Sequence, residues 1–434
     1  METNKKNIPE IRFPEFMNDG EWRLDTIETI FDIRNGYTPS KANPLFWENG
    51  TIPWFRMEDI RKSGHILSDA IQHITPKAVK GSGLIPAYSI IVATTATIGE
   101  HALTIVDSLA NQQFTFLTKC KSFEKRIDML YFHYFMFIID EWCKRNTNAG
   151  GLLSVNMDSF KRLVVPYPPT IAEQKRIAEC FYSLDKVIES TRQKLEQLKA
   201  HKKGLMQKLF PAPGKSVPEC RFKEFENDGE WEQMYIKDIF EFIPNNTLSR
   251  AELNYNIGNV KDIHYGDILT SFNEYLNTQK ETIPFVTNLN LSEKLKRGKL
   301  NNGDIVIADT AEDETVGKCT EITNMQHIDT IVSGLHTIAL HPTTKFATGF
   351  LGFFMNSESF RHQLLPLMQG VKVLSLSKKA IASCNIYYPM SFLEQKRIAE
   401  CLTSLNDQIC LYNDKLDILE RHKQALRQRL FPTI

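Results

Sequence analysis

Two stretches of the chain carry apolar residues spaced alternately four and three positions apart, one over residues 177–209 and one over 398–430. This spacing, sustained over about four heptads, predicts two long helices that each carry the a/d seam of a left-handed coiled coil. The predicted seam residues are Ile177, Phe181, Leu184, Ile188, Leu195, Leu198, Leu205 and Leu209 in the first helix, and Ile398, Leu402, Leu405, Ile409, Leu416, Leu419, Leu426 and Leu430 in the second.

The apolar seam is interrupted at matching heptad positions of the two helices. These positions are Thr191 and Lys202 in the first helix and Tyr412 and Lys423 in the second. A polar residue in such a seam costs stability but fixes the register and the partner. A helix of ~37 residues is roughly 55 Å long. Because the two registers match, we expect the helices to pair antiparallel within one chain. A coiled coil between separate chains is the alternative.

Both helices begin with the pattern of a capping box. Thr170 precedes Glu173 by three positions, and Ser391 precedes Glu394 by the same spacing. In a capping box the acid reaches back to the first backbone N–H of the helix. We therefore assign this capping role to both glutamates.

The segments outside the helices carry shorter apolar runs bounded by turn residues, which is typical of strands. In the first module we expect strands at 51–55, 87–95, 114–118 and 163–166 and a helix from 126 to about 145. In the second we expect strands at 267–271, 304–308, 330–332 and 335–340 and a helix around 348–365. The mixture predicts two α+β modules.

The chain repeats itself at both ends of each module. Residues 8–31 and 217–240 are identical at 14 of 24 positions, and residues 173–211 and 394–432 at 21 of 39. The intervening segments resemble each other much less. A repeat this long indicates domain duplication with an internal pseudo-twofold relation. We place the first module at 1–168, its helix at 169–211, a linker at 212–218, the second module at 219–389 and its helix at 390–434.

The composition is that of an ordinary globular protein, with 42% apolar and 24% charged residues. The 52 basic and 52 acidic residues cancel, which argues against a broadly basic nucleic-acid binder but leaves local patches open. The eight cysteines form no CxxC pair or zinc-type cluster. The start of the chain has no secretory pattern, and the most apolar stretch, 129–142, is too short for the ~20 residues of a membrane span. We expect a cytoplasmic protein without metal or membrane contact.

The sequence shows no methyl-donor loop, no Asn/Asp-Pro-Pro-Tyr/Phe tetrapeptide and no GxxxxGK phosphate loop. Asp158, Glu173 and Lys175 superficially fit a Mg²⁺-dependent nuclease pattern. The second copy has Lys379 in place of the aspartate, and capping already explains the glutamate. The sequence therefore predicts no catalytic centre.

Contact chemistry lies instead on the expected loops of the modules. Polar and basic side chains on loops are the groups that grip phosphates and read base edges. The candidate DNA-binding residues are Tyr37, Thr38, Ser40, Lys41, Arg56, Lys77, Lys80 and Asn148 in the first half, and Arg250, Asn288, Lys294, Lys296, Arg297 and Lys372 in the second.

The pattern resembles the specificity subunits (HsdS) of Type I restriction-modification systems. The residues that carry the resemblance are the EQKRIAEC helix openings, the Leu-Phe-Pro endings, the RFPEF…GEW starts, the Gly36–Pro39 turn with Ile52–Trp54, Gly303–Val306, and Ser154 and Ser375. The second module departs from this pattern, because it has Pro244–Thr247 near the place of the Gly-Tyr-Thr-Pro turn.

The resemblance implies a non-catalytic subunit with two target-recognition domains, separated by a long antiparallel coiled-coil helix pair. Each domain would read one half of a bipartite, asymmetric DNA target, and the helices would set the spacing. Two methyltransferase (HsdM) subunits and motor-nuclease (HsdR) subunits would be the partners. They would bring S-adenosylmethionine, ATP and Mg²⁺ chemistry. Because the net charge of the chain is zero, a coiled-coil adaptor whose modules bind protein or glycan remains the alternative.

Overall fold

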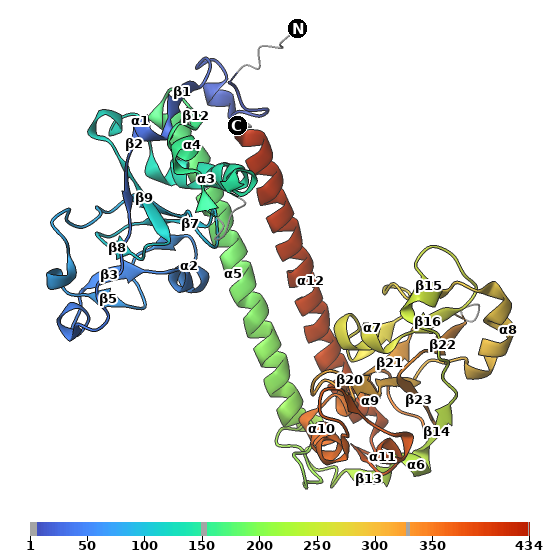
Figure 1. Cartoon of the computed structure of the whole chain (residues 1–434). Coiled ribbons are helices and arrows are strands. Elements are labelled where there is room, and N and C mark those ends of the chain that lie inside the picture. Colours follow the sequence, from blue (N-terminus) through green and yellow to red (C-terminus); the bar gives the residue numbers. More distant parts are fainter. Residues whose placement is uncertain (1–6, 149–153, 327–329, 433) are drawn as a thin grey trace. The chain divides into compact units, whose positions relative to one another are not determined.

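The computed structural model describes residues 7–148, 154–326, 330–432 and 434. The chain forms two compact units. Unit 1 comprises Met1–Thr191 with Lys415–Ile434, and unit 2 comprises Arg192–Asp414. Each unit therefore contains one module together with part of α5 (Ile171–Leu209) and part of α12 (Phe392–Leu430), the two long helices in green and red in Figure 1.

The module of unit 1 is built from short strands and helices. Its strands are β1 (Arg23–Thr26), β2 (Phe31–Asn35), β3 (Ile52–Phe55), β4 (Ile66–Leu67), β5 (His73–Ile74), β6 (Ser89–Ala93), β7 (His101–Thr104), β8 (Leu109–Ala110), β9 (Phe114–Lys119), β10 (Thr147–Asn148), β11 (Ser154–Val155) and β12 (Val164–Tyr167). Its helices are α1 (Ile27–Ile30), α2 (Met57–Ser63), α3 (Met129–Arg145) and α4 (Met157–Lys161).

The module of unit 2 has a corresponding set of elements. Its strands are β13 (Glu232–Tyr235), β14 (Phe240–Ile243), β15 (Leu253–Asn254), β16 (Lys261–Ile263), β17 (Tyr275–Asn277), β18 (Phe285–Val286), β19 (Ile305–Ala308), β20 (Thr310–Ala311), β21 (Cys319–Thr323), β22 (Ile331–Ser333), β23 (Thr337–Pro342), β24 (Leu374–Ser375) and β25 (Asn385–Tyr388). Its helices are α6 (Ile236–Ile239), α7 (Tyr265–Thr270), α8 (Ser292–Leu295), α9 (Phe350–Met355), α10 (Glu358–Leu364) and α11 (Lys378–Ala382).

The two modules share one sheet topology although their sequences have diverged. Unit 1 has a five-stranded sheet in the order β2-β9-β6-β7-β4, and unit 2 has one in the order β14-β23-β19-β21-β17. In both sheets the last pair is parallel and the others are antiparallel. The outer sheets also correspond, since β5-β3-β8 matches β18-β16-β22, and unit 2 adds β15.

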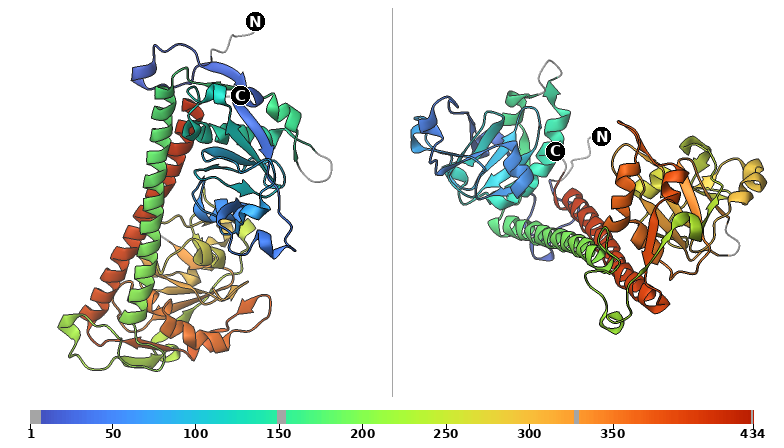
Figure 2. Two further views of the ribbon diagram at one scale, coloured as in Figure 1. Left: turned by 90° about the vertical axis from the view of Figure 1, so that its left-hand side faces the viewer. Right: turned by 90° about the horizontal axis from the view of Figure 1, so that it is seen from below.

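The central strands of each sheet are buried on both faces, so their apolar residues alternate between two cores. Ile90 and Val92 of β6 join a core with α3 and the helix ends, whereas Ile91 and Ala93 join the core under the outer sheet. In unit 2, β19 divides in the same way between its two cores. Figure 2 shows from two further sides how α3 and the outer strands of unit 1 lie about its sheet.

The long helices run antiparallel within each unit. In unit 1 the start of α5 lies against the end of α12, where Phe181 stacks on Phe431 at 5.5 Å between ring centroids. In unit 2 the end of α5 and the start of α12 share a core that contains Phe210 and Ile398. The α+β fold with two modules, a long antiparallel helix pair and an internal repeat is therefore confirmed.

The structure buries or half-buries the seam residues predicted from the heptads. The buried ones are Ile177, Phe181, Ile188, Leu195, Leu198, Leu209, Ile398, Leu402, Leu405 and Leu430. The half-buried ones are Leu184, Leu205, Ile409, Leu416, Leu419 and Leu426.

Both lysine lapses in the seam are explained by ion pairs. Lys423 binds Asp185 at 2.5 Å, and Lys202 binds Glu274 at 2.6 Å. The α12 position equivalent to Asp185 is Asn406, which donates to the same Glu274 at 3.0 Å. The acidic partner of the seam lysine therefore lies on the long helix α5 in unit 1, whereas in unit 2 it lies in the module.

Two of the expected elements are wrong. Residues 267–270 lie in helix α7 rather than in a strand, and Ser271 is the residue that ends this helix. The His264 side chain caps the helix by accepting from Gly266 N–H, and Asp267 and Ile268 are buried. The helix expected around 348–365 is split into α9 and α10, because Ser357 ends the first helix and caps the second. Among the described helices, none is both long enough and apolar enough to cross a bilayer.

Candidate nucleic-acid interface and module–helix junction

Three loops of unit 1 meet beside the outer sheet and bring together six of the eight candidate residues of the first half. They are residues 36–41, 76–80 and 111–113, which we call the first loop cluster. Gly36 N–H donates to the Phe114 carbonyl and Tyr37 N–H to the Ala110 carbonyl, both at 2.8 Å. The carbonyls of Asn111 and Ala110 lie where a β-carbon on Gly36 would be. This loop therefore requires glycine.

Tyr37 and two tryptophans hold the first loop cluster in place. The Tyr37 hydroxyl donates to the Ala78 carbonyl at 3.1 Å and accepts from Lys80 N–H at 2.9 Å. The Lys80 ammonium lies 4.3 Å from the centroid of the Tyr37 ring. Trp54 Nε1 donates to the Tyr37 carbonyl, and Trp47 Nε1 to the Ser40 carbonyl, both at 3.0 Å. Tyr37 is thus a structural member of the cluster as well as a candidate contact.

The remaining members present polar groups at the surface. Ser40, Lys41, Lys77 and Lys80 are exposed, and the Thr38 hydroxyl donates to Gln112. Gln112 lies on the loop of Asn111–Gln113, which the sequence argument missed, although three consecutive amides between two strands are a usable signal.

Two candidates of the first half lie elsewhere. Arg56 occupies the N-cap position of α2, where its backbone N–H donates to Asp59 at 2.7 Å, and its guanidinium pairs with Glu58 at 2.7 Å. Asn148 ends β10, next to 149–153, which lie outside the described residues, as does the Asn148 side chain.

In unit 2 the candidates separate into two groups. Lys294 lies in α8, and Arg250, Asn288, Lys296 and Arg297 lie on the turns around β15, β18 and α8. Lys372 lies on another hairpin, which ends in β24 and is joined to β20. All of these side chains are exposed, and none belongs to the hydrophobic cores of unit 2.

Arg250 serves the fold of unit 2. Its guanidinium forms hydrogen bonds of 2.7 and 2.8 Å to both oxygens of the buried Asp267 and one of 2.8 Å to the Tyr255 hydroxyl. The hydrogen bond with Asp267 raises the pKa of Arg250. Nearby, burial raises the pKa of Asp262 to about 6, although Asn246 donates to its carboxylate at 2.6 Å. A guanidinium already bound to a carboxylate in this way is a poor reader of bases.

A buried ion pair, present twice, joins the two repeated blocks within each unit. In unit 1 Arg12 forms hydrogen bonds of 2.7 and 2.6 Å to the two carboxylate oxygens of Glu173. In unit 2 Arg221 binds Glu394 with two hydrogen bonds of 2.7 Å. Both glutamate side chains are fully buried. Each pair ties the start of its module to the first turn of a long helix.

The glutamine that follows each glutamate makes a second tie. Gln174 accepts from Asp128 N–H at 2.8 Å and donates to the Pro168 carbonyl at 3.0 Å. Gln395 accepts from Ala347 N–H at 3.0 Å and donates to the Pro389 carbonyl at 2.9 Å. These bonds join each long helix to the segment that begins α3 or α9.

The capping role assigned to the two glutamates is only half right. The Thr170 and Ser391 hydroxyls do accept from the glutamate N–H groups, each at 3.3 Å. The carboxylates, however, bind arginines from a distant part of the sequence. The same finding removes the nuclease triad, since the Glu173 carboxylate is occupied and Asp158 lies exposed on α4. Among the described residues, no group of three or more His, Cys, Asp or Glu side chains is placed to hold a metal ion.

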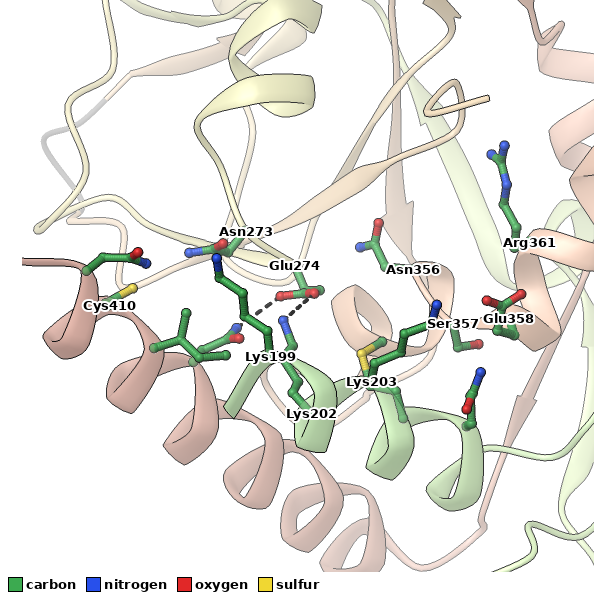
Figure 3. A pocket seen from close by; sticks show the side chains of 15 residues that line it. Lys199, Lys202, Lys203, Asn273, Glu274, Asn356, Ser357, Glu358, Arg361 and Cys410 are labelled. Atoms are coloured by element: carbon green, nitrogen blue, oxygen red, sulfur yellow. Dashed lines mark hydrogen bonds and ion pairs between the residues drawn. The ribbon is translucent and has the colours of Figure 1, made fainter. Parts of the chain in front are cut away.

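Unit 2 also contains a charged cavity of about 630 Å³ between α5, α12 and the start of α10. Figure 3 shows Lys202 pointing toward Glu274, and Lys199, Lys203 and Arg361 also line the cavity. The Lys202 ammonium lowers the pKa of Glu274 against the opposing effect of burial. The cavity is polar and carries a structural ion pair, and it offers no catalytic arrangement of a nucleophile and a base.

The family to which these features belong follows from comparison with known proteins. The model described as "Type I restriction modification DNA specificity domain" matches residues 19–200 and 228–421. The chain belongs to this family. The match is double and spans both modules, so it agrees with the internal repeat. The resemblance inferred from the sequence is confirmed.

Individual relatives are specificity subunits of Type I restriction enzymes. The EcoprrI subunit of Escherichia coli is 44% identical over 174 residues, which cover 39% of this chain and 43% of that protein. The MjaVIII subunit of Methanocaldococcus jannaschii is 25% identical over 323 residues, 72% of each chain. A solved S subunit from M. genitalium has a TM-score of 0.58 at 15% identity, covering 98% of this chain and all of that one. This last likeness concerns the fold.

Proposed function

We propose that the chain is the non-catalytic DNA-specificity subunit of a Type I restriction-modification complex, and that each module reads one half of a bipartite, asymmetric target. The observation that carries the proposal is the contrast between the two units. They share one sheet topology and the same buried arginine–glutamate junction, whereas their surface loops carry different side chains. Two equal frameworks with different loops suit two different half-sites.

The loops have the chemistry that a duplex requires. In unit 1, Lys41, Lys77 and Lys80 supply cations, and Gln112 supplies an amide, within one loop cluster. In unit 2, Lys294 and Arg297 supply cations beside Asn288. Lysines contact phosphates, and amides or arginines read base edges in the major groove. The net charge of zero does not oppose this function, because partner subunits share the phosphate contacts.

The partners and cofactors belong to the same proposal. Two methyltransferase subunits dock on the helices, and a motor-nuclease subunit joins for cleavage. S-adenosylmethionine, ATP and Mg²⁺ bind in those subunits. The helix pair fixes the gap between half-sites that lie about one DNA turn apart, ~34 Å.

The test is the methylome of cells that express the chain with its methyltransferase. We expect adenine methylation at one sequence made of two specified halves and a fixed gap. Methylation without sequence preference, or none that depends on the chain, contradicts the proposal. If the assembled complex shows no salt-dependent affinity for DNA, the adaptor function is favoured instead.

A pair of substitutions assigns each half-site to a module. Lys41→Ala with Lys77→Ala should weaken binding through unit 1, and Lys294→Ala with Arg297→Ala should do so through unit 2. Each lost phosphate contact should reduce the slope of log affinity against log salt by about 1. Lys125→Ala is the control, because Lys125 is exposed beyond the opposite end of β9. Equal effects of the control and the test variants refute the assignment.

A further inference from the structure

A small polar cluster lies at the surface of unit 2, where β19 ends and β23 begins. It consists of Asp309, Thr310 and His336, and we call it the His336 cluster. His336 Nδ1 lies 3.5 Å from Asp309 Oδ1 and 3.3 Å from the Thr310 hydroxyl oxygen. The Thr310 hydroxyl donates to the same Asp309 oxygen at 2.8 Å. Three side chains from two separate loops therefore meet at one point.

The His336 cluster occupies the place in unit 2 that borders the first loop cluster in unit 1. In unit 1 the Thr94 N–H donates to the Gln113 carbonyl at 3.1 Å. In unit 2 the Asp309 N–H donates to the His336 carbonyl at 3.0 Å. The registers of β6 with β9 and of β19 with β23 fix the same correspondence. Asp309 thus takes the place of Thr94. His336 takes the place of Gln113, a member of the first loop cluster.

The His336 cluster also lies between the two groups of candidate residues of unit 2. On one side the Tyr265 ring packs edge-on against the His336 ring, at 5.4 Å between ring centroids. Tyr265 begins α7, the helix to which Arg250 is bound. On the other side β20 pairs with β24 at the base of the hairpin that carries Lys372. The cluster therefore connects the two groups.

The backbone of His336 has an uncommon conformation. Its φ is +53°, in the left-handed region that residues other than glycine, asparagine and aspartate rarely adopt. The side chain is 48% exposed, so the hydrophobic cores do not require a histidine at this position. Backbone strain of this kind is concentrated at functional sites.

Another histidine–aspartate pair, at the opposite end of the same two strands, is built differently. His341 Nδ1 lies 2.6 Å from Asp304 Oδ1, and the Asn301 N–H donates to Asp304 Oδ2 at 2.7 Å. The Asp304 side chain is fully buried, and both of its oxygens are bound. The Asp309 side chain is 24% exposed, and its Oδ2 has no hydrogen-bond partner among the described residues. The His336 cluster therefore keeps one acceptor that the fold does not use.

We propose that Asp309 and His336 read a base pair of the half-site that binds unit 2. This inference rests on the proposed function and assigns residues to it. Phosphates repel a carboxylate, so on a surface that meets DNA it contacts base edges, where it accepts from the amino group of cytosine or adenine. His336 holds this carboxylate in place and contacts the adjoining base. Unit 1 has the uncharged Thr94 and Gln113 at these places, as a different half-site requires.

The experiment measures the base preference of the chain assembled with its methyltransferase. The substrate is a library of DNA duplexes in which both half-sites are randomised, and sequencing of the methylated duplexes gives the preference at each position. Asp309→Asn keeps the shape of the side chain but replaces one acceptor oxygen by a donor. His336→Asn removes the imidazole, and asparagine tolerates the positive φ. The matched control is His341→Asn, which breaks the pair at the opposite end of the same strands.

We expect the wild type to require adenine or cytosine on one strand at one position of one half-site. Asp309→Asn should lower this preference at least about fivefold, because a mismatched base pair costs 1–3 kcal/mol. His336→Asn should lower the preference at the same or the adjoining position. The other half-site should keep its preference in both variants, and His341→Asn should leave both half-sites unchanged.

Two results overturn the proposal. One is an unchanged base preference in Asp309→Asn and His336→Asn. The other is an equal loss of methylation on all sequences, which shows that the pair only supports the fold. The Asp309→Asn result decides alone if His336→Asn does not assemble with the methyltransferase. A wild-type complex that methylates without sequence preference overturns the proposed function itself.

Discussion

The buried ion pair between Arg12 and Glu173 gives the sharpest test of how the modules are attached to the helices. Glu173→Ala leaves a guanidinium in a site where its side chain is 6% exposed. The variant loses the hydrogen bond that raises the pKa of Arg12, but a guanidinium stays protonated in proteins without it, so deprotonation cannot relieve the charge. Removing one partner of such a pair costs about 3–5 kcal/mol.

Unit 2 supplies a matched variant, Glu394→Ala, which breaks the pair with Arg221. The two sites differ in one contact. Trp22 Nε1 donates to Glu173 at 3.2 Å, whereas the buried Trp231 Nε1 has no acceptor among the described residues. Glu173→Ala therefore also strands a tryptophan donor, and it should cost roughly 1 kcal/mol more than Glu394→Ala.

The assay is urea-induced unfolding monitored by hydrogen–deuterium exchange, because exchange rates report the unfolding of the two units separately. Each variant should lower the free energy of unfolding of its own unit. Glu15→Ala is the control, because its pair with Arg176 is half-exposed and should contribute less than about 1 kcal/mol. A Glu173→Ala loss no larger than the Glu15→Ala loss refutes the reasoning.

Three further predictions concern other parts of the fold. Gly36→Ala should displace the first loop cluster, lowering stability by about 1–3 kcal/mol and DNA affinity through unit 1 alone; unchanged binding of both half-sites contradicts this. Burial lowers the pKa of His101 to about 3 and that of His133 well below 6.5, so the unfolded chain takes up protons first. Stability should fall as pH drops from 6.5 toward 3, and a pH titration of His133→Phe should show a smaller fall. Burial raises the pKa of Glu321 to about 7, so its contribution to stability should decline as pH rises from 4.5 to 7, and Glu321→Gln should remove that slope.

The helices were predictable because their signal is local and periodic. The heptads gave the seam residues, and only the seam lapses needed the structure, which pairs Lys202 with Glu274 and Lys423 with Asp185. Strands such as 304–308 were also recognisable as apolar runs. The strand expected at 267–271 failed because five residues of mixed polarity fit either period, and the His264 cap decides for a helix.

The candidate site was predictable in residue type but not in role. The loop lysines lie at the surface as expected, yet Arg250 and Arg56 already form ion pairs with carboxylates of their own unit. Gln112 was missed because its position beside Thr38 depends on strand pairing between residues far apart in the sequence. Single-sequence patterns carry no information about such pairings.

The sequence by itself determined that the molecule is a duplicated design of module and long helix, and which positions were kept alike in both copies. Periodicity and internal identity are properties of the linear chain. Only the tertiary structure decided why those positions were kept, because Arg12 and Glu173 are 161 residues apart and meet only when the module folds onto its helix. It likewise separated the residues that hold each unit together from those that remain exposed at its surface, since burial is a property of the folded chain.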